Sequence, residues 1–113
     1  MSDKTGAQLI AAERQRQIEF EGWTPEHDDD YKSGQLSMAA ACYAFHTSAG
    51  ISTESGAVEW SREDIYGIRE VQRIVRTAWP WHRQWWKPDT RIRNLVKAGA
   101  LIAAEIDRLK RIA

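Results

Sequence analysis

Ten residues from Trp79 to Pro88, WPWHRQWWKP, combine aromatic rings with cationic side chains. The segment holds four of the chain's six tryptophans, interleaved with His82, Arg83 and Lys87. Indole rings stack on flat ligands such as nucleobases, and arginine and lysine bind phosphate oxygens. The same rings can instead bury their apolar surface and complete the core of a small protein. We expect a mixed outcome, with two of these tryptophans structural and one or two lining a binding site.

Two polar residues, Glu13 and Gln17, interrupt the inner face of the first predicted helix. A buried carboxylate needs a cationic partner. The cationic candidates on the last predicted helix are Arg91, Arg93 and Lys97. One interpretation is a salt bridge between helices that fixes how they pack. The other is a carboxylate and an amide that contact a base edge or a ribose hydroxyl. The sequence leaves both open.

An acidic run over residues 26–30, EHDDD, is either a divalent metal site or a solvated turn whose acids cap a helix. Adjacent residues in a turn seldom converge on one ion, and no His-x-x-x-His or Cys-x-x-Cys pair is present. A metal site that uses Asp28, Asp29 and Glu105 is therefore the weaker interpretation, and we expect Asp28 to anchor the first helix. Cys42 and His46 have the spacing of a metal pair, but an alanine-rich helix around them favours packing.

The elements that must position these residues are helical. Thr5 and Gln8 form a capping box before a helix over about 6–21, which Gly22 ends. Thr24 and Pro25 then start a short helical turn. The stretch QLSMAAACYAFHT, residues 35–47, is apolar on nearly every side, which predicts a buried helix.

A loop over residues 48–60 precedes a second capping box, made of Ser61 and Asp64. The helix that follows stops before Pro80, and an edge hairpin is the alternative there. Asp89 is the expected cap of the last helix. An apolar stripe along that helix consists of Ile92, Leu95, Gly99, Ile102, Ile106 and Leu109. These patterns predict an all-α fold with a single helical domain over residues 1–113, a compact bundle of three to four helices with a long Trp-rich loop before the C-terminal helix.

The amino-acid composition limits which classes of binding partner and which cellular location we expect. Sixteen Lys and Arg balance sixteen Asp and Glu, so the formal net charge is zero and a general affinity for extended nucleic acid is not expected. One cysteine fits a reducing compartment. No membrane-spanning apolar run and no signal-peptide pattern is present, so we expect a cytoplasmic protein with no membrane partner. A small core and the stripe on the last helix favour a homo-oligomer.

Three stretches, AAERQRQIEFEGWTPEHDD, AAACYA and LVKAGALIAAEIDRL, resemble small proteins of bacteriophages and prophages. Those proteins are similar in turn to the MazG-like group of all-α nucleotide pyrophosphohydrolases. The resemblance covers most of the chain and is weakest over residues 50–78. It implies a nucleotide-sized pocket in a helical bundle.

The chain departs from the MazG-like pattern at the metal site. Those enzymes hold Mg²⁺ with a Glu-x-x-Glu pair on one helix and a Glu-x-x-Asp pair on the next. The corresponding helix here, QLSMAAACYA, contains no carboxylate, and Glu105 and Asp107 point to different faces of theirs. The resemblance therefore implies a nucleotide site without the usual hydrolysis, with no catalytic residue and no cofactor.

We expect a phage-derived protein that sequesters a small nucleotide, such as a cyclic di- or oligonucleotide messenger of bacterial anti-phage immunity. A divergent pyrophosphohydrolase that places Mg²⁺ on Glu13, Asp28, Asp29 and Glu105 is the alternative. A module that binds a host protein through its tryptophan segment is the second alternative. The expected ligand-binding residues are Glu13, Gln17, Trp23, His27, Tyr43, Trp79, Trp81, Arg83, Trp85, Lys87, Arg91 and Lys97.

Overall fold

The structure is a computed structural model that describes residues 3–48 and 65–113. Its elements are α1 (Gly6–Glu21), α2 (Pro25–Asp28), α3 (Gln35–Ser48), α4 (Ile65–Ala78), the 3₁₀ turn η1 (Arg83–Trp85) and α5 (Arg91–Ile112). Within these two ranges every regular element is helical, so the all-α fold is confirmed and the hairpin alternative for α4 is wrong. The loop predicted over residues 48–60 begins one residue too early, because Ser48 still belongs to α3. The rest of that loop and the predicted capping box at Ser61 and Asp64 lie outside the described residues.

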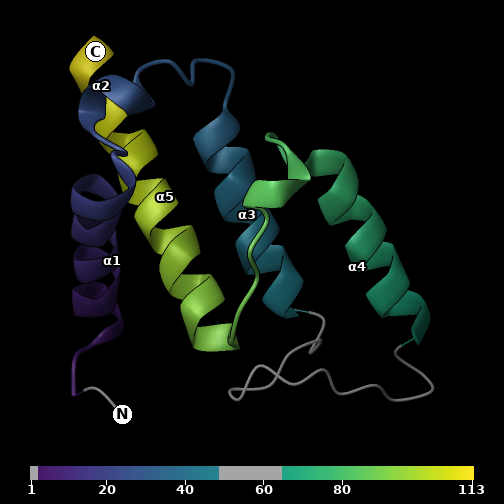
Figure 1. Cartoon of the computed structure of the whole chain (residues 1–113). Helices are drawn as coiled ribbons and strands as arrows, with labels where there is room; N and C mark the ends of the chain where they lie inside the picture. Colours follow the sequence, from purple (N-terminus) through teal and green to yellow (C-terminus); the bar gives the residue numbers. More distant parts are fainter. Residues whose placement is uncertain (1–2, 49–64) are drawn as a thin grey trace.

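Four helices lie side by side in the order α1, α5, α3, α4 (Figure 1). The C-terminal helix α5 packs against both α1 and α3, and α3 packs in turn against α4. The short helix α2 lies against the C-terminal half of α5. The tryptophan segment links α4 to α5 and crosses α3 in the view of Figure 1. Three of its rings, Trp79, Trp81 and Trp86, pack against the core cluster that α3 and α5 share.

Helix ends follow the expected capping chemistry, with one correction. Thr5 and Gln8 form the reciprocal capping box, and Gly22 ends α1 with a left-handed φ of 71°. Thr24 caps α2. The cap of α5 is Thr90, whose hydroxyl accepts the Arg93 N–H, so the assignment to Asp89 was wrong by one residue.

Two apolar clusters form the core. The larger one is rich in alanine on α3 and α5, which lets these helix backbones approach closely. The smaller one joins Cys42 of α3 to Val71 and Val75 of α4. Trp79 and Trp86 pack against both clusters and therefore connect them. Trp81 packs on the larger cluster alone, and Trp85 is 54% exposed.

The apolar stripe of α5 lies largely outside this core. Its five large side chains remain 43–52% exposed, whereas the small residues Ala98, Ala100 and Ala104 are buried. Bulky side chains would hold the neighbouring helices apart, so the alanine side of α5 faces inward and the branched side faces outward. Gly99 is the exception within the stripe, because Ile10 of α1 lies over it.

Candidate functional site

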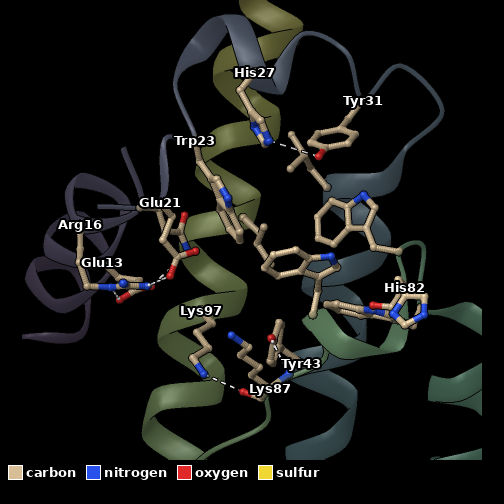
Figure 2. A pocket seen from close by; sticks show the side chains of 16 residues that line it. Glu13, Arg16, Glu21, Trp23, His27, Tyr31, Tyr43, His82, Lys87 and Lys97 are labelled. Atoms are coloured by element: carbon tan, nitrogen blue, oxygen red, sulfur yellow. Dashed lines mark hydrogen bonds and ion pairs between the residues drawn. The ribbon is translucent and has the colours of Figure 1, made fainter. Parts of the chain in front are cut away.

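A cavity of about 780 Å³ opens between α1, α3, α5 and the tryptophan segment (Figure 2). That volume lies within the range of small-molecule sites, roughly 300–1,000 Å³. Ten of the twelve expected ligand-binding residues line it, namely Glu13, Gln17, Trp23, His27, Tyr43, Trp79, Trp81, Trp85, Lys87 and Lys97. We call it the aromatic cavity.

Two expected residues lie elsewhere. Arg83 is exposed in η1 and Arg91 is exposed at the first position of α5, and neither lines the cavity. Six lining residues were not among those expected: Arg16, Glu21, Tyr31, Leu36, His82 and Leu101. Arg16 was detectable in principle, because it lies one turn from Glu13. Tyr31 was not, since nothing in the sequence shows that the acidic loop folds back over the bundle.

The carboxylate corner of the cavity is built on Glu13, which is 3% exposed. Arg16 donates to both its oxygens, at 2.9 and 2.8 Å, and also to Glu21. Arg93 of α5 donates to the Glu13 Oε1 at 2.7 Å, which is the interhelix salt bridge that one interpretation required. Burial alone would raise the pKa of Glu13, but the two guanidinium partners outweigh it and lower that pKa to about 2.

Two buried polar atoms, one at this corner and one in the aromatic part of the cavity, have no hydrogen-bond partner within residues 3–48 and 65–113. Gln17 is 2% exposed, and its amide N–H donates to Glu13 at 3.2 Å, but its Oε1 accepts no hydrogen bond from the described residues. The Trp81 indole N–H likewise finds no acceptor among them. A buried polar group without a partner costs about 1–3 kcal/mol. Both side chains line the aromatic cavity, although these two atoms themselves are buried from solvent.

Two lysines form the cationic floor of the cavity. The Lys97 ammonium donates to the Lys87 carbonyl oxygen at 2.7 Å and lies 5.5 Å from the centre of the Tyr43 ring. The Lys87 ammonium lies 5.6 Å from the centre of the Trp85 ring. Among the described residues, no carboxylate comes within 4 Å of either ammonium. Burial lowers the pKa of Lys97.

Aromatic rings form the wall opposite the carboxylates (Figure 2). Trp81 lies between its neighbours, with ring centres 6.4 Å from Trp23, 5.2 Å from Tyr31 and 5.4 Å from Trp79. The His27 ring is parallel to Trp23 at 6.2 Å. These contacts fix the rings before any ligand arrives, so a planar ligand would meet a preformed surface.

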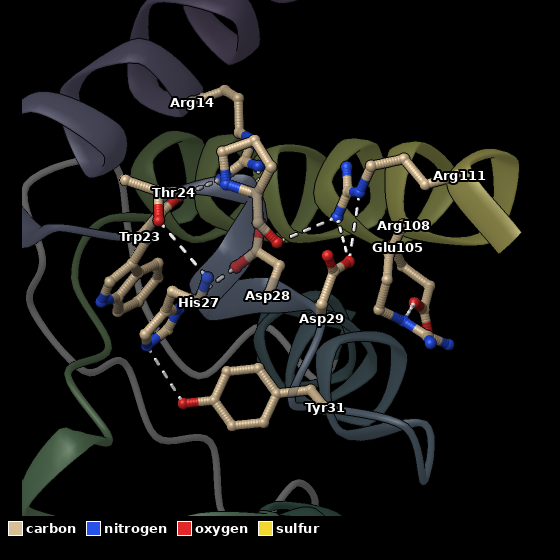
Figure 3. A network of polar contacts seen from close by, with 11 residues as sticks. Arg14, Trp23, Thr24, His27, Asp28, Asp29, Tyr31, Glu105, Arg108 and Arg111 are labelled. Carbon is tan, nitrogen blue, oxygen red and sulfur yellow. Dashed lines mark hydrogen bonds and ion pairs between the residues drawn. The ribbon is translucent and has the colours of Figure 1, made fainter.

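The weaker metal interpretation does not fit the geometry. Asp28 is fully buried and accepts from Arg14 of α1 at 2.6 Å, which is the expected anchor to the first helix. Asp29 instead pairs with Arg111, and Glu105 with Arg108 (Figure 3). Over residues 3–48 and 65–113 no three metal-binding side chains come together. The carboxylates proposed for Mg²⁺ are therefore held by separate arginines.

Cys42 and His46 take part in packing. The Cys42 thiol is buried, which raises its pKa, and its Sγ lies 4.0 Å from the Val75 carbonyl oxygen. The His46 ring meets the Trp86 ring edge-on at 5.5 Å, and burial lowers the pKa of this histidine. The two side chains thus contact α4 and the tryptophan segment separately.

No protein-family model matches the chain, and no curated protein and no solved structure matches it either. None of the helices in the described ranges has the length and apolar character needed to cross a bilayer. The chemistry of the aromatic cavity is therefore the basis for a functional proposal.

Proposed function

We propose that this protein binds a small nucleotide in the aromatic cavity and sequesters it without cleaving it. The observation that carries the proposal is a pair of lysines, Lys87 and Lys97, at the floor of an aromatic cavity and without a carboxylate partner in the described chain. Lys97 is partly buried and Lys87 is exposed. A partly desolvated ammonium such as that of Lys97 favours an anion, and phosphate is the anion that accompanies a stacking ring in nucleotides.

The distribution of groups supports one orientation of the ligand. The phosphate would lie near Lys87 and Lys97, and the base would stack on the wall that contains Trp81. The base edge would then face the Gln17 amide. Such polar contacts add specificity, because an analogue that lacks them leaves buried groups unpaired.

Sequestration fits this site better than hydrolysis does. The carboxylates of the pyrophosphohydrolase alternative, Asp28, Asp29 and Glu105, pair with arginines outside the aromatic cavity (Figure 3). Glu13 does line the cavity, but two guanidinium groups occupy its oxygens. We include in the proposal the phage origin, the MazG-like ancestry and the bacterial cytoplasm that the sequence resemblance implies, with a cyclic di- or oligonucleotide messenger as the preferred ligand class.

The proposal is tested by titration calorimetry with a panel of linear and cyclic nucleotides, with and without Mg²⁺. Bound nucleotide is then released and its mass compared with that of the input. We expect binding of at least one nucleotide, intact recovery and no need for Mg²⁺. Conversion that depends on Mg²⁺ would favour the hydrolase, and no affinity for any nucleotide would favour a host-protein partner.

A matched pair of lysine variants tests whether the nucleotide binds in the aromatic cavity. Lys97→Met should weaken nucleotide binding by about 10-fold or more, because hydrogen bonds to charged groups contribute about 1.5–3 kcal/mol. Lys110→Met removes an exposed lysine on the same helix, outside the cavity, and should leave the affinity unchanged.

A further inference from the structure

One face of α5 is apolar, exposed and directed away from the aromatic cavity. Five side chains, Ile92, Leu95, Ile102, Ile106 and Leu109, remain 43–52% exposed. Ile102 follows the cavity residue Lys97 by five positions, roughly 140° around the helix. The exposed stripe and the aromatic cavity therefore lie on different sides of α5, and a partner on one side would leave the other open.

The spacing along this stripe is that of a helix-pairing seam. From Ile92 to Leu109 the intervals alternate between three and four residues, with Gly99 in the series. This is the a/d pattern by which two helices interlock their side chains. Ile10 of α1 lies over Gly99 and supplies a bulky side chain where the seam has none.

A shallow groove accompanies the seam. It encloses about 320 Å³ between α3 and α5, with Ala40, Ala41 and Ala44 on one wall and Ile102, Ile106 and Leu109 on the other. Two bulky side chains on the α3 side, Met38 and Phe45, are 46% and 39% exposed. They lie three and four residues from Ala41, on the same face of α3. Hollows and projections thus occur together on one surface.

We infer that this surface, made of the α5 stripe and the outer face of α3, binds a second copy of the chain. A two-fold interface uses the same patch on both molecules, so it needs projections and hollows on one surface. Within the described residues, α5 is the element that exposes an a/d seam. A second copy of the chain would therefore present a matching seam to the first. The result is a back-to-back dimer.

Charge argues against a charged macromolecule as the occupant. The formal net charge is zero, so two copies do not repel each other. Glu105 at the groove is paired within its own helix to Arg108, and both side chains are buried. The surface thus offers no excess charge to a nucleic acid or to an acidic or basic protein, and apolar burial is what it can contribute to binding.

Sedimentation equilibrium of the full chain tests the dimer. We expect twice the chain mass for the wild type at micromolar concentration. Ile102→Glu places two carboxylates in the apolar seam, so the dissociation constant should rise by at least about 100-fold. Leu109→Lys, near the end of α5 where local unfolding is cheap, is the second variant and should dissociate the dimer as well. Far-UV circular dichroism verifies that each variant is folded.

Phe20→Glu is the matched control. Phe20 is 78% exposed, and it lies on the side of α1 that carries Glu13 and Arg16, both lining residues of the aromatic cavity. This variant should remain dimeric. A monomeric wild type at millimolar concentration, or a dimer that neither Ile102→Glu nor Leu109→Lys weakens, would overturn the inference. Nucleotide binding is measured separately, so either proposal can fail alone.

Discussion

Glu13 and Arg93 are 80 residues apart in the chain and 2.7 Å apart in the structure. Their ion pair joins α1 to α5 at the edge of the aromatic cavity and leaves the carboxylate almost fully buried. Glu13→Gln should therefore lower the free energy of unfolding at pH 7 by about 3 kcal/mol. This is the low end for a broken buried pair, because Arg16 and Arg93 are partly exposed. Urea unfolding measures this loss.

The same pair predicts an acid-dependent stability. Glu13 has a pKa of about 2 in the folded protein against a usual value of 4.5, so the unfolded chain binds the additional proton between these pH values. The contribution of ionised Glu13 to the free energy of unfolding is complete above pH 4.5 and is lost as the pH falls towards 2. Glu13→Gln should flatten this part of the stability curve, whereas Glu19→Gln, at an exposed position of α1, should leave it unchanged.

Trp79 and Trp85 should respond differently to truncation. Trp79 packs against both core clusters, so Trp79→Ala should cost about 3–5 kcal/mol of stability. Trp85 is more than half exposed, so Trp85→Ala should cost less than about 1 kcal/mol and should weaken nucleotide binding instead. Thermal melting and calorimetry separate the two effects. If both variants simply unfold, the stacking surface loses its main support.

Nucleotide affinity should fall at alkaline pH. Burial lowers the pKa of Lys97, so the ammonium that would hold the phosphate loses its proton below the usual lysine range. We expect the affinity for a cyclic dinucleotide to weaken as the pH rises through that lowered pKa. Lys97→Arg keeps its charge and should shift the decline to higher pH. An affinity that declines over the same pH range in the wild type and in Lys97→Arg would contradict the assigned role.

Gly99 should resist replacement even though it lies in a helix. A Cβ atom there would lie 2.4 Å from the Ile10 Cδ1 and 2.7 Å from its Cγ1. Overpacking costs about 1–3 kcal/mol, which exceeds the roughly 1 kcal/mol that alanine gains over glycine in a helix. Gly99→Ala should thus destabilise the protein modestly. In a protein that already carries Ile10→Ala, Gly99→Ala should lower the free energy of unfolding by less than it does in the wild type. A double-mutant cycle with urea unfolding measures this difference.

Local sequence signals predicted much of the fold. Thr5, Gln8 and Gly22 set the ends of α1 because each acts on neighbouring backbone groups. The error at the start of α5 has a local cause that the sequence pattern did not reveal. Asp89 and Thr90 are both suitable caps, and the choice depends on Asn94, whose side chain accepts the Asp89 N–H at 2.6 Å and donates to the Asp89 carbonyl at 3.1 Å.

The site was less predictable because it depends on contacts across the chain. Glu13 and Gln17 were noticeable as polar residues on an otherwise apolar face. Tyr31 enters the cavity because α2 anchors the acidic loop against α1 and α5, through Asp28 with Arg14 and Asp29 with Arg111. No spacing rule encodes those ion pairs. Arg83 was misplaced for a related reason, since the 3₁₀ turn directs it to solvent.

The tryptophan rings described above also have a spectroscopic consequence. Trp23, Trp81, Trp79 and Trp86 form a continuous series, with successive ring centres 6.4, 5.4 and 4.9 Å apart. At such separations an excited indole shares its energy with its neighbours, so these four emit as a coupled set. A molecule that quenches any one of them dims the rest. Ligand binding in the aromatic cavity can therefore be followed by the intrinsic tryptophan fluorescence, without an added label.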